Sequence, residues 1–184
     1  EYTSGKLHKF TIEVSKKSDS GLEFKLVGED ITPWESETIT HDGTAREYVV
    51  INVPAASTDG SSALKTAIET SGKDYTKIKN LKVTGEVNAI DFYFMRDEMS
   101  VLQGVNMKEA NVVGKKIPNE AFRNKYTLSR FIFPSDIIGI CDWSFENTSL
   151  SGYLNIPDGC QYIESYVFNN CTNLTSFYLP NSIE

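Results

Sequence analysis

The sequence predicts an α+β fold in two parts. Residues 58–184 are expected to form a solenoid of short parallel strands in 23-residue repeats, and residues 1–57 a small antiparallel β module in front of it. Three observations lead to this prediction. Apolar, asparagine and proline positions recur every 23 residues near the C-terminus. Apolar and polar residues alternate near the N-terminus, as in half-buried strands. A chain of 184 residues is long enough for one or two domains.

The 23-residue period is the strongest signal in the chain. A proline ends each copy of the strand because it cannot donate a hydrogen bond to a neighbouring strand. One such unit cannot bury its apolar face alone, whereas stacked units can, with one parallel strand per turn. The recurring positions are Ile117, Ile140 and Ile163; Phe122, Phe145 and Phe168; Asn124, Asn147 and Asn170; and Pro134, Pro157 and Pro180.

The predicted strands are residues 131–133, 154–156 and 177–179. Their first and third residues are expected to face the core, so the residues between and before them face outward. Solenoids bind partners along such a face, and Tyr and Arg are favoured at binding centres. The alternative is that these are ordinary strand residues of high β propensity. The candidate binding face comprises Arg130, Ile132, Tyr153, Asn155, Ser176 and Tyr178, and continues to Gly104 and Asn106.

Residues 62–112 are expected to be an atypical N-terminal capping region of the solenoid, and residues 117–184 its regular repeats. Within the cap, Ser62 begins a helix over residues 63–70 that stops at Gly72. Asn88 begins a second helix over residues 89–101. Residues 81–88 and 102–107 are expected to be degenerate strands of the same sheet.

The N-terminal module is predicted from three runs of strand-like residues. Phe10–Val14 and Leu22–Leu26 alternate between apolar and polar residues, and a polar loop joins them. Glu47–Val53 is a third, more apolar strand that Pro54 stops, and Thr38–Thr40 forms a short edge strand. Residues 55–61 then serve as the linker.

Composition argues against several classes of function. The net charge of −7 disfavours a nucleic-acid partner, which needs a basic surface. No apolar run is long enough to span a membrane. With only two histidines, His8 and His41, the chain offers little for a metal site or a catalytic triad, so we expect neither a cofactor nor an enzyme. The three cysteines, Cys141, Cys160 and Cys171, are expected to be small core residues, although a disulfide between two of them is an alternative.

The repeats resemble the BspA-like class of bacterial leucine-rich repeats. The pattern from Ile117 to Pro134 carries the resemblance, and the copy from Val167 to Pro180 is closest to it. The resemblance covers about residues 78–184 and is tight from 117 onward. Lys125 and Thr148 replace the cysteine that the family typically has at that position, whereas Cys171 keeps it.

The resemblance implies an extracellular or cell-surface module that binds a host protein, another cell or a glycan without catalysis. A structural spacer without a ligand of its own is the alternative, and a glycoside-processing enzyme a third. The chain begins at Glu1 without an initiating Met, so we expect it to be processed or trimmed. The last strand would leave an open edge, covered by further chain, by packing or by oligomerisation.

Overall fold

The computed structural model describes residues 9–16, 22–30 and 47–183. It divides the chain between Arg46 and Glu47 into two compact units. In the first unit, β1 (Lys9–Lys16) pairs antiparallel with β2 (Leu22–Asp30), with Val14 opposite Phe24. The predicted strands Phe10–Val14 and Leu22–Leu26 lie within β1 and β2. The predicted strand Thr38–Thr40 lies outside the described residues.

The assignment of Glu47–Val53 to the antiparallel module is wrong. In the structure this segment contains β3 (Val49–Val53), which pairs in parallel with β4 (Asn80–Val87). Ile51 and Val53 are buried in the same core as the side chains of β4. Burial of these two apolar residues is what holds β3 on the second unit, so the division falls before β3 and not near residue 57.

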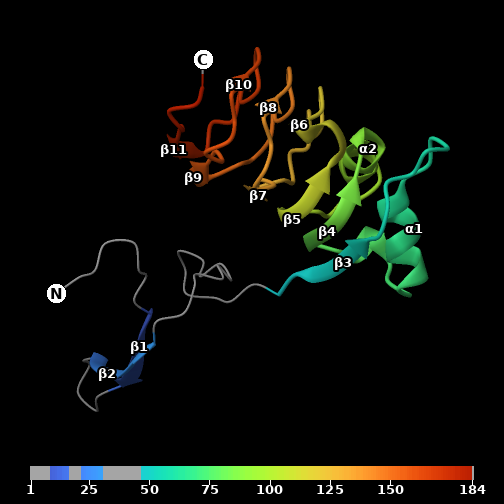
Figure 1. The fold of residues 1–184 in the computed structure, drawn as a ribbon. Coiled ribbons are helices and arrows are strands. Elements are labelled where there is room, and N and C mark those ends of the chain that lie inside the picture. Colours follow the sequence, from blue (N-terminus) through green and yellow to red (C-terminus); the bar gives the residue numbers. More distant parts are fainter. Residues whose placement is uncertain (1–8, 17–21, 31–46, 184) are drawn as a thin grey trace. The chain divides into compact units, whose positions relative to one another are not determined.

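Four parallel strands form the main sheet of the second unit, in the order β3-β4-β5-β7 (Figure 1). The third strand, β5, spans Gly104–Val112, and β7 spans Arg130–Ile132. Leu81 of β4 lies opposite Val105 of β5, which in turn lies opposite Phe131 of β7. Because parallel strands run in the same direction, the segment between two of them must return along the sheet. These connecting segments are helical or irregular.

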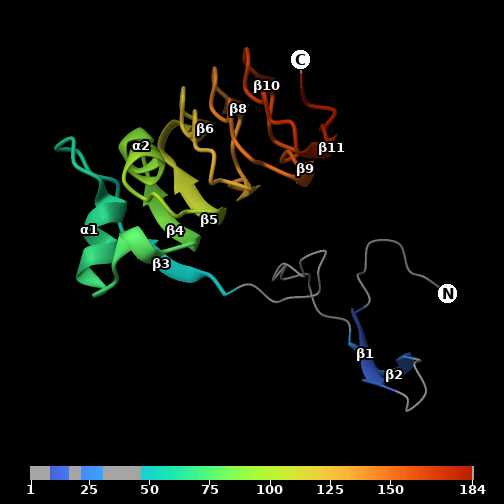
Figure 2. The ribbon, with the colours of Figure 1, turned by 180° about the vertical axis from the view of Figure 1, so that it is seen from behind.

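Two helices, α1 (Ala63–Thr70) and α2 (Ala89–Asp97), lie beside β3, β4 and β5 (Figures 1 and 2). The predicted caps are confirmed: the Ser62 side chain accepts from the Lys65 amide, and Asn88 begins α2 with a capping box. The helix α2 ends at Asp97, before the predicted Val101. Short 3-10 turns lie at Tyr75–Lys77, between α1 and β4, and at Val113–Lys115, after β5. None of the described helices is long and apolar enough to cross a membrane.

One buried carboxylate joins the two helices. Asp91 is fully buried and accepts hydrogen bonds from Ser62 Oγ at 2.8 Å and from the amides of Leu64 at 2.9 Å and Asn88 at 3.0 Å. These donors lie at the first turn of α1 and at the N-cap of α2, where backbone N–H groups lack partners within the helix. The side chain of Asp91 therefore completes the start of both helices.

Each regular repeat contributes two short strands, so the prediction of one strand per turn is wrong. The strands β7, β9 (Gly152–Asn155) and β11 (Leu174–Tyr178) coincide with the predicted ones to within three residues. A second row pairs β6 (Lys116–Ile117) with β8 (Gly139–Ile140), and β8 with β10 (Tyr162–Ile163), all in parallel. The recurring isoleucines Ile117, Ile140 and Ile163 lie in this second row.

The recurring phenylalanines form a column through the core. Phe122 stacks on Phe145 with 5.6 Å between ring centroids, and Phe145 stacks on Phe168 at the same distance. The edges of Phe131 and Phe133 pack against Phe145, which is fully buried. Each of these repeats places one phenylalanine at the same position, so equivalent rings stack on one another. The core of one repeat is therefore stabilised by contact with the next.

The last strand departs from the predicted inward pattern. Phe131, Phe133, Leu154 and Ile156 are buried as expected, but Phe177 is 47% exposed and Leu179 is 54% exposed. Among the described residues, no further strand lies beside β11 on its outer edge. These two apolar side chains therefore remain in contact with solvent.

Candidate functional site

The residues of the predicted face lie in two rows across the strands. In the first row, Gly104 is opposite Arg130, and Tyr153 is opposite Ser176. In the second row, Asn106 is opposite Ile132, and Asn155 is opposite Tyr178. The bond from the Ser151 amide to the Ser129 carbonyl, 3.1 Å long, links the approach to β9 with the approach to β7. The parallel register thus aligns Arg130 and Ile132 with strand β5, and Tyr153 and Asn155 with Ser176 and Tyr178 of β11.

Exposure differs along the two rows. Tyr153, Asn155, Ser176 and Tyr178 are exposed, whereas Arg130 and Ile132 are half-buried. Tyr153 exposes 62% of its surface. Exposed tyrosines offer large, rigid contact areas that lose little conformational entropy on binding. The C-terminal half of the face therefore presents the greater accessible aromatic surface.

The Arg130 side chain extends from β7 toward β4 and passes over Gly104 of β5, which has no side chain to block it. Its Nη2 donates to Asn80 Oδ1 at 2.9 Å. Its Nε atom is buried and has no hydrogen-bond partner in the described part of the chain. A Cβ atom at position 104 would lie 3.1 Å from Nη2 and 3.5 Å from Nε. Glycine at position 104 therefore allows the guanidinium to lie over the neighbouring strand, toward Asn80.

Two other polar side chains of this face have partners. Lys82, opposite Asn106 on the second row, pairs with Glu109 at 2.7 Å. The hydroxyl of Tyr178 donates to Asp158 Oδ1 at 2.9 Å, and this hydrogen bond raises the pKa of Tyr178. Because the tyrosine is held from one side, its ring has a defined position on the surface.

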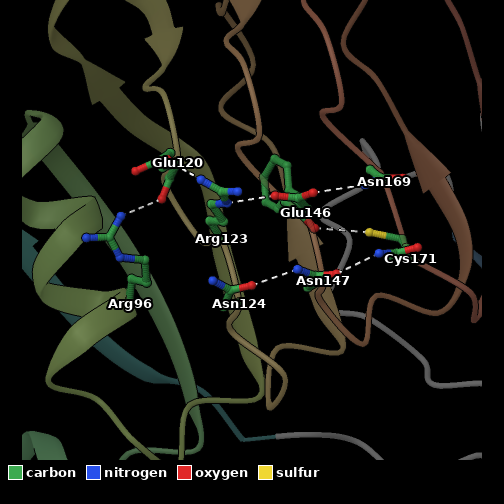
Figure 3. Close-up of polar contacts among 10 residues, drawn as sticks. Arg96, Glu120, Arg123, Asn124, Glu146, Asn147, Asn169 and Cys171 are labelled. Atoms are coloured by element: carbon green, nitrogen blue, oxygen red, sulfur yellow. Dashed lines mark hydrogen bonds and ion pairs between the residues drawn. The ribbon is translucent and has the colours of Figure 1, made fainter.

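A second polar array, which the sequence analysis missed, runs through the turns of three repeats (Figure 3). Arg123 donates from Nε to Glu146 Oε2 at 2.6 Å and from Nη1 to Glu120 Oε1 at 2.5 Å. Glu146 in turn accepts from Asn169 Nδ2 at 2.9 Å. The exact 23-residue spacing of Arg123, Glu146 and Asn169 is the signal that could have revealed this array.

The recurring asparagines form a parallel ladder. Asn147 Nδ2 donates to Asn124 Oδ1 at 2.7 Å, and Asn170 Nδ2 donates to Asn147 Oδ1 at 2.9 Å (Figure 3). All three residues have positive φ, between 57° and 62°, a conformation that asparagine tolerates better than most residues. The three asparagines lie in turns, and their side chains bond to the asparagine of the neighbouring repeat.

A pocket of about 440 Å³ opens where this array meets α2, and its lining is polar. Arg96 pairs with Asp97 at 2.7 Å and donates to the Glu120 carbonyl, and the bond from Arg96 lowers the pKa of Asp97. The arginines of the pocket pair with its carboxylates, and the bond from Arg96 to the Glu120 carbonyl connects α2 to the repeats.

The cysteines are buried free thiols. Burial raises the pKa of Cys141 to about 11, and it raises the pKa of Cys160 and Cys171 as well. Cys171 Sγ donates to the Phe145 carbonyl at 3.1 Å. A protonated, buried thiol is a poor nucleophile at neutral pH. In the described ranges, no three His, Cys, Asp or Glu side chains gather closely enough to hold a metal ion.

Comparison with known families agrees with this geometry. Residues 98–184 match the BspA type leucine rich repeat region, in six copies. No curated protein matches the chain. Members of such families are typically surface or secreted proteins, generally non-catalytic, whose repeats mediate protein binding. The second unit, with few helices and short parallel strands, fits this α+β fold. Residues 98–184 are therefore a BspA-type leucine-rich repeat region, as the pattern from Ile117 to Pro180 indicated.

Proposed function

We propose that residues 47–184 form a solenoid whose parallel sheet is a non-catalytic binding face for a protein or glycan at the cell surface. In this proposal residues 62–112 close the N-terminal side of the stack. The observation that carries the proposal is the exposure of Tyr153 and Tyr178 on the paired strands β9 and β11, together with the half-buried Arg130 of β7, which has no acidic partner among the described residues. Tyr and Arg are the residues most often found at the energetic centres of interfaces.

The magnitude of the expected contact follows from exposure. Tyr153 is 62% exposed, so a partner that covers it would remove roughly 100 Å² of mainly apolar surface from water. At about 25 cal/mol per Å², this is roughly 2–3 kcal/mol before the costs of association. Loss of such a contact would weaken binding by one to two orders of magnitude, at about tenfold per 1.4 kcal/mol.

The test is a binding screen of the chain against purified extracellular-matrix proteins and polysaccharides. A Tyr153→Ala/Tyr178→Ala variant tests the face, and Tyr126→Ala is the matched control because Tyr126 is 67% exposed on a turn outside the two rows. We expect binding that the double variant loses and the control keeps. Equal binding by all three would place the contact elsewhere, and no binding by the wild-type chain would count against the proposal.

A structural spacer is the second candidate. The ladder Asn124–Asn147–Asn170 and the column of stacked phenylalanines tie each repeat to the next, as a stiff rod requires. A spacer would tolerate alanine at Tyr153 and Tyr178 without loss of function. The same variants therefore separate the two candidates.

A further inference from the structure

Arg130 differs from the other arginines of the described residues in having no carboxylate beside it. Arg96 pairs with Asp97, and Arg123 pairs with Glu120 and Glu146. Among the described residues, the Arg130 side chain makes one hydrogen bond, to the neutral amide of Asn80. The whole chain carries seven more acidic than basic residues, so acidic partners are abundant in it. Arg130 is therefore the exception among the described arginines, since the other two each pair with a carboxylate.

The surroundings of Arg130 hold its guanidinium in place and leave its charge uncompensated. Asn80 fixes one end of the group, and Gly104 provides the space in which it lies. The Nε donor is buried and has no acceptor among the described residues, which costs stability, so an incoming group can approach only the terminal nitrogens of the guanidinium. The nearest charged pair on the second row, Lys82 with Glu109, is satisfied internally. An incoming group with acceptor oxygens would meet a positioned cation.

The chemistry of this site selects the kind of acceptor. A guanidinium is planar and binds a carboxylate with two parallel hydrogen bonds, which gives both strength and direction. A polyanion, such as a nucleic acid or a sulfated polysaccharide, gains affinity from many cations at once. Of the described arginines, only Arg130 is without a carboxylate partner, and the net charge of −7 on the chain would repel a polyanion. A single carboxylate needs only this one cation.

We propose that Arg130 is the anchor for an Asp or Glu side chain of a protein partner that lies across the two rows of the sheet face. The inference rests on the proposed binding function and specifies its partner as an acidic peptide segment. The neighbouring strand places exposed Tyr153 one repeat further along, where it can pack against the aliphatic part of the same segment. Lysine would not replace Arg130, since it lacks the planar pair of donors.

The test uses a defined probe, the peptide acetyl-Gly-Glu-Gly-amide, with its Gln analogue as the neutral control. The Nε–Hε signals of the ¹⁵N-labelled full chain are followed by NMR during titration. We expect the Arg130 signal to shift with the Glu peptide and not with the Gln peptide, and the shift to shrink at high salt. The signals of Arg96 and Arg123 serve as internal controls, because their guanidinium groups are already paired.

Two variants sharpen the result. Arg130→Lys should weaken binding of the Glu peptide by about tenfold. Gly104→Ala keeps the charge but crowds the guanidinium, so it should also weaken binding. Equal shifts with the Glu and Gln peptides, or no shift of the Arg130 signal, would overturn the inference, and neither result depends on a variant. If Arg130 does not respond while the Tyr153→Ala/Tyr178→Ala variant still loses its partner, the proposed function stands and the carboxylate anchor fails.

Discussion

The buried carboxylate of Asp91 offers the most demanding test of the second unit's stability. Three donors, Ser62 Oγ and the amides of Leu64 and Asn88, converge on it within 3.0 Å. The Asp91→Ala substitution leaves all three without an acceptor in a site with no exposure to solvent. Each lost cap costs about 1 kcal/mol, and each buried unsatisfied donor about 1–3 kcal/mol. We expect the free energy of unfolding to fall by about 3–5 kcal/mol.

The measurement is urea-induced unfolding followed by circular dichroism at a helical wavelength, which reports on α1 and α2. Asp91→Asn should cost about 1–2 kcal/mol, because the amide keeps one acceptor but places its own donor near a backbone N–H. Asp97→Ala is the control: this carboxylate is mainly exposed and paired with Arg96, so its loss should cost less than about 1 kcal/mol. If Asp91→Ala and Asp97→Ala lower stability equally, Asp91 does not join the helix starts as argued.

Three further predictions concern other parts of the second unit. Gly85 has a φ of 82°, and a Cβ there would collide with the Val53 carbonyl, so Gly85→Ala should lower the free energy of unfolding by about 2–4 kcal/mol in the same urea assay. Because burial raises the pKa of Cys141 from 9.0 to about 11, its thiol favours the folded state below pH 9, and that contribution is lost as pH rises toward 11. Thermal unfolding across this range should show a shallower alkaline decline in Cys141→Ala than in the wild-type chain; identical slopes would contradict this. Exposed Phe177 and Leu179 should promote self-association, so Phe177→Ser/Leu179→Ser should reduce the concentration-dependent mass measured by light scattering, and an unchanged mass would exclude this edge as the contact.

Much of the repeat region could be predicted because its evidence is periodic. A single 23-residue step located the strands β7, β9 and β11 and the stacked column of Phe122, Phe145 and Phe168. The second row of strands was missed because each is two residues long and carries one recurring isoleucine. Alternation, the usual mark of a strand, cannot be recognised over two residues.

Other features depended on partners that lie far away in the sequence. The segment Glu47–Val53 alternates in the same way whether it pairs antiparallel with β2 or parallel with β4, so its pattern did not decide between them. The role of Arg130 was equally hidden, since Asn80 and Gly104 lie 50 and 26 residues before it. The outward orientation of the candidate face followed from the strand period, but the unpaired state of its arginine required the three-dimensional structure.

The asparagine ladder, the phenylalanine column and the strand register share one repeat length, and this has a consequence for changes in chain length. Removal of one residue within a repeat would displace later members of all three arrays from their counterparts, because the contacts of Asn147 with Asn170, Phe145 with Phe168 and Tyr153 with Ser176 each join positions 23 apart. Removal or duplication of a whole repeat would keep every contact. The region can therefore lengthen or shorten in steps of 23 residues with its internal contacts preserved, which would make the reach of the proposed binding face adjustable without redesign of the core.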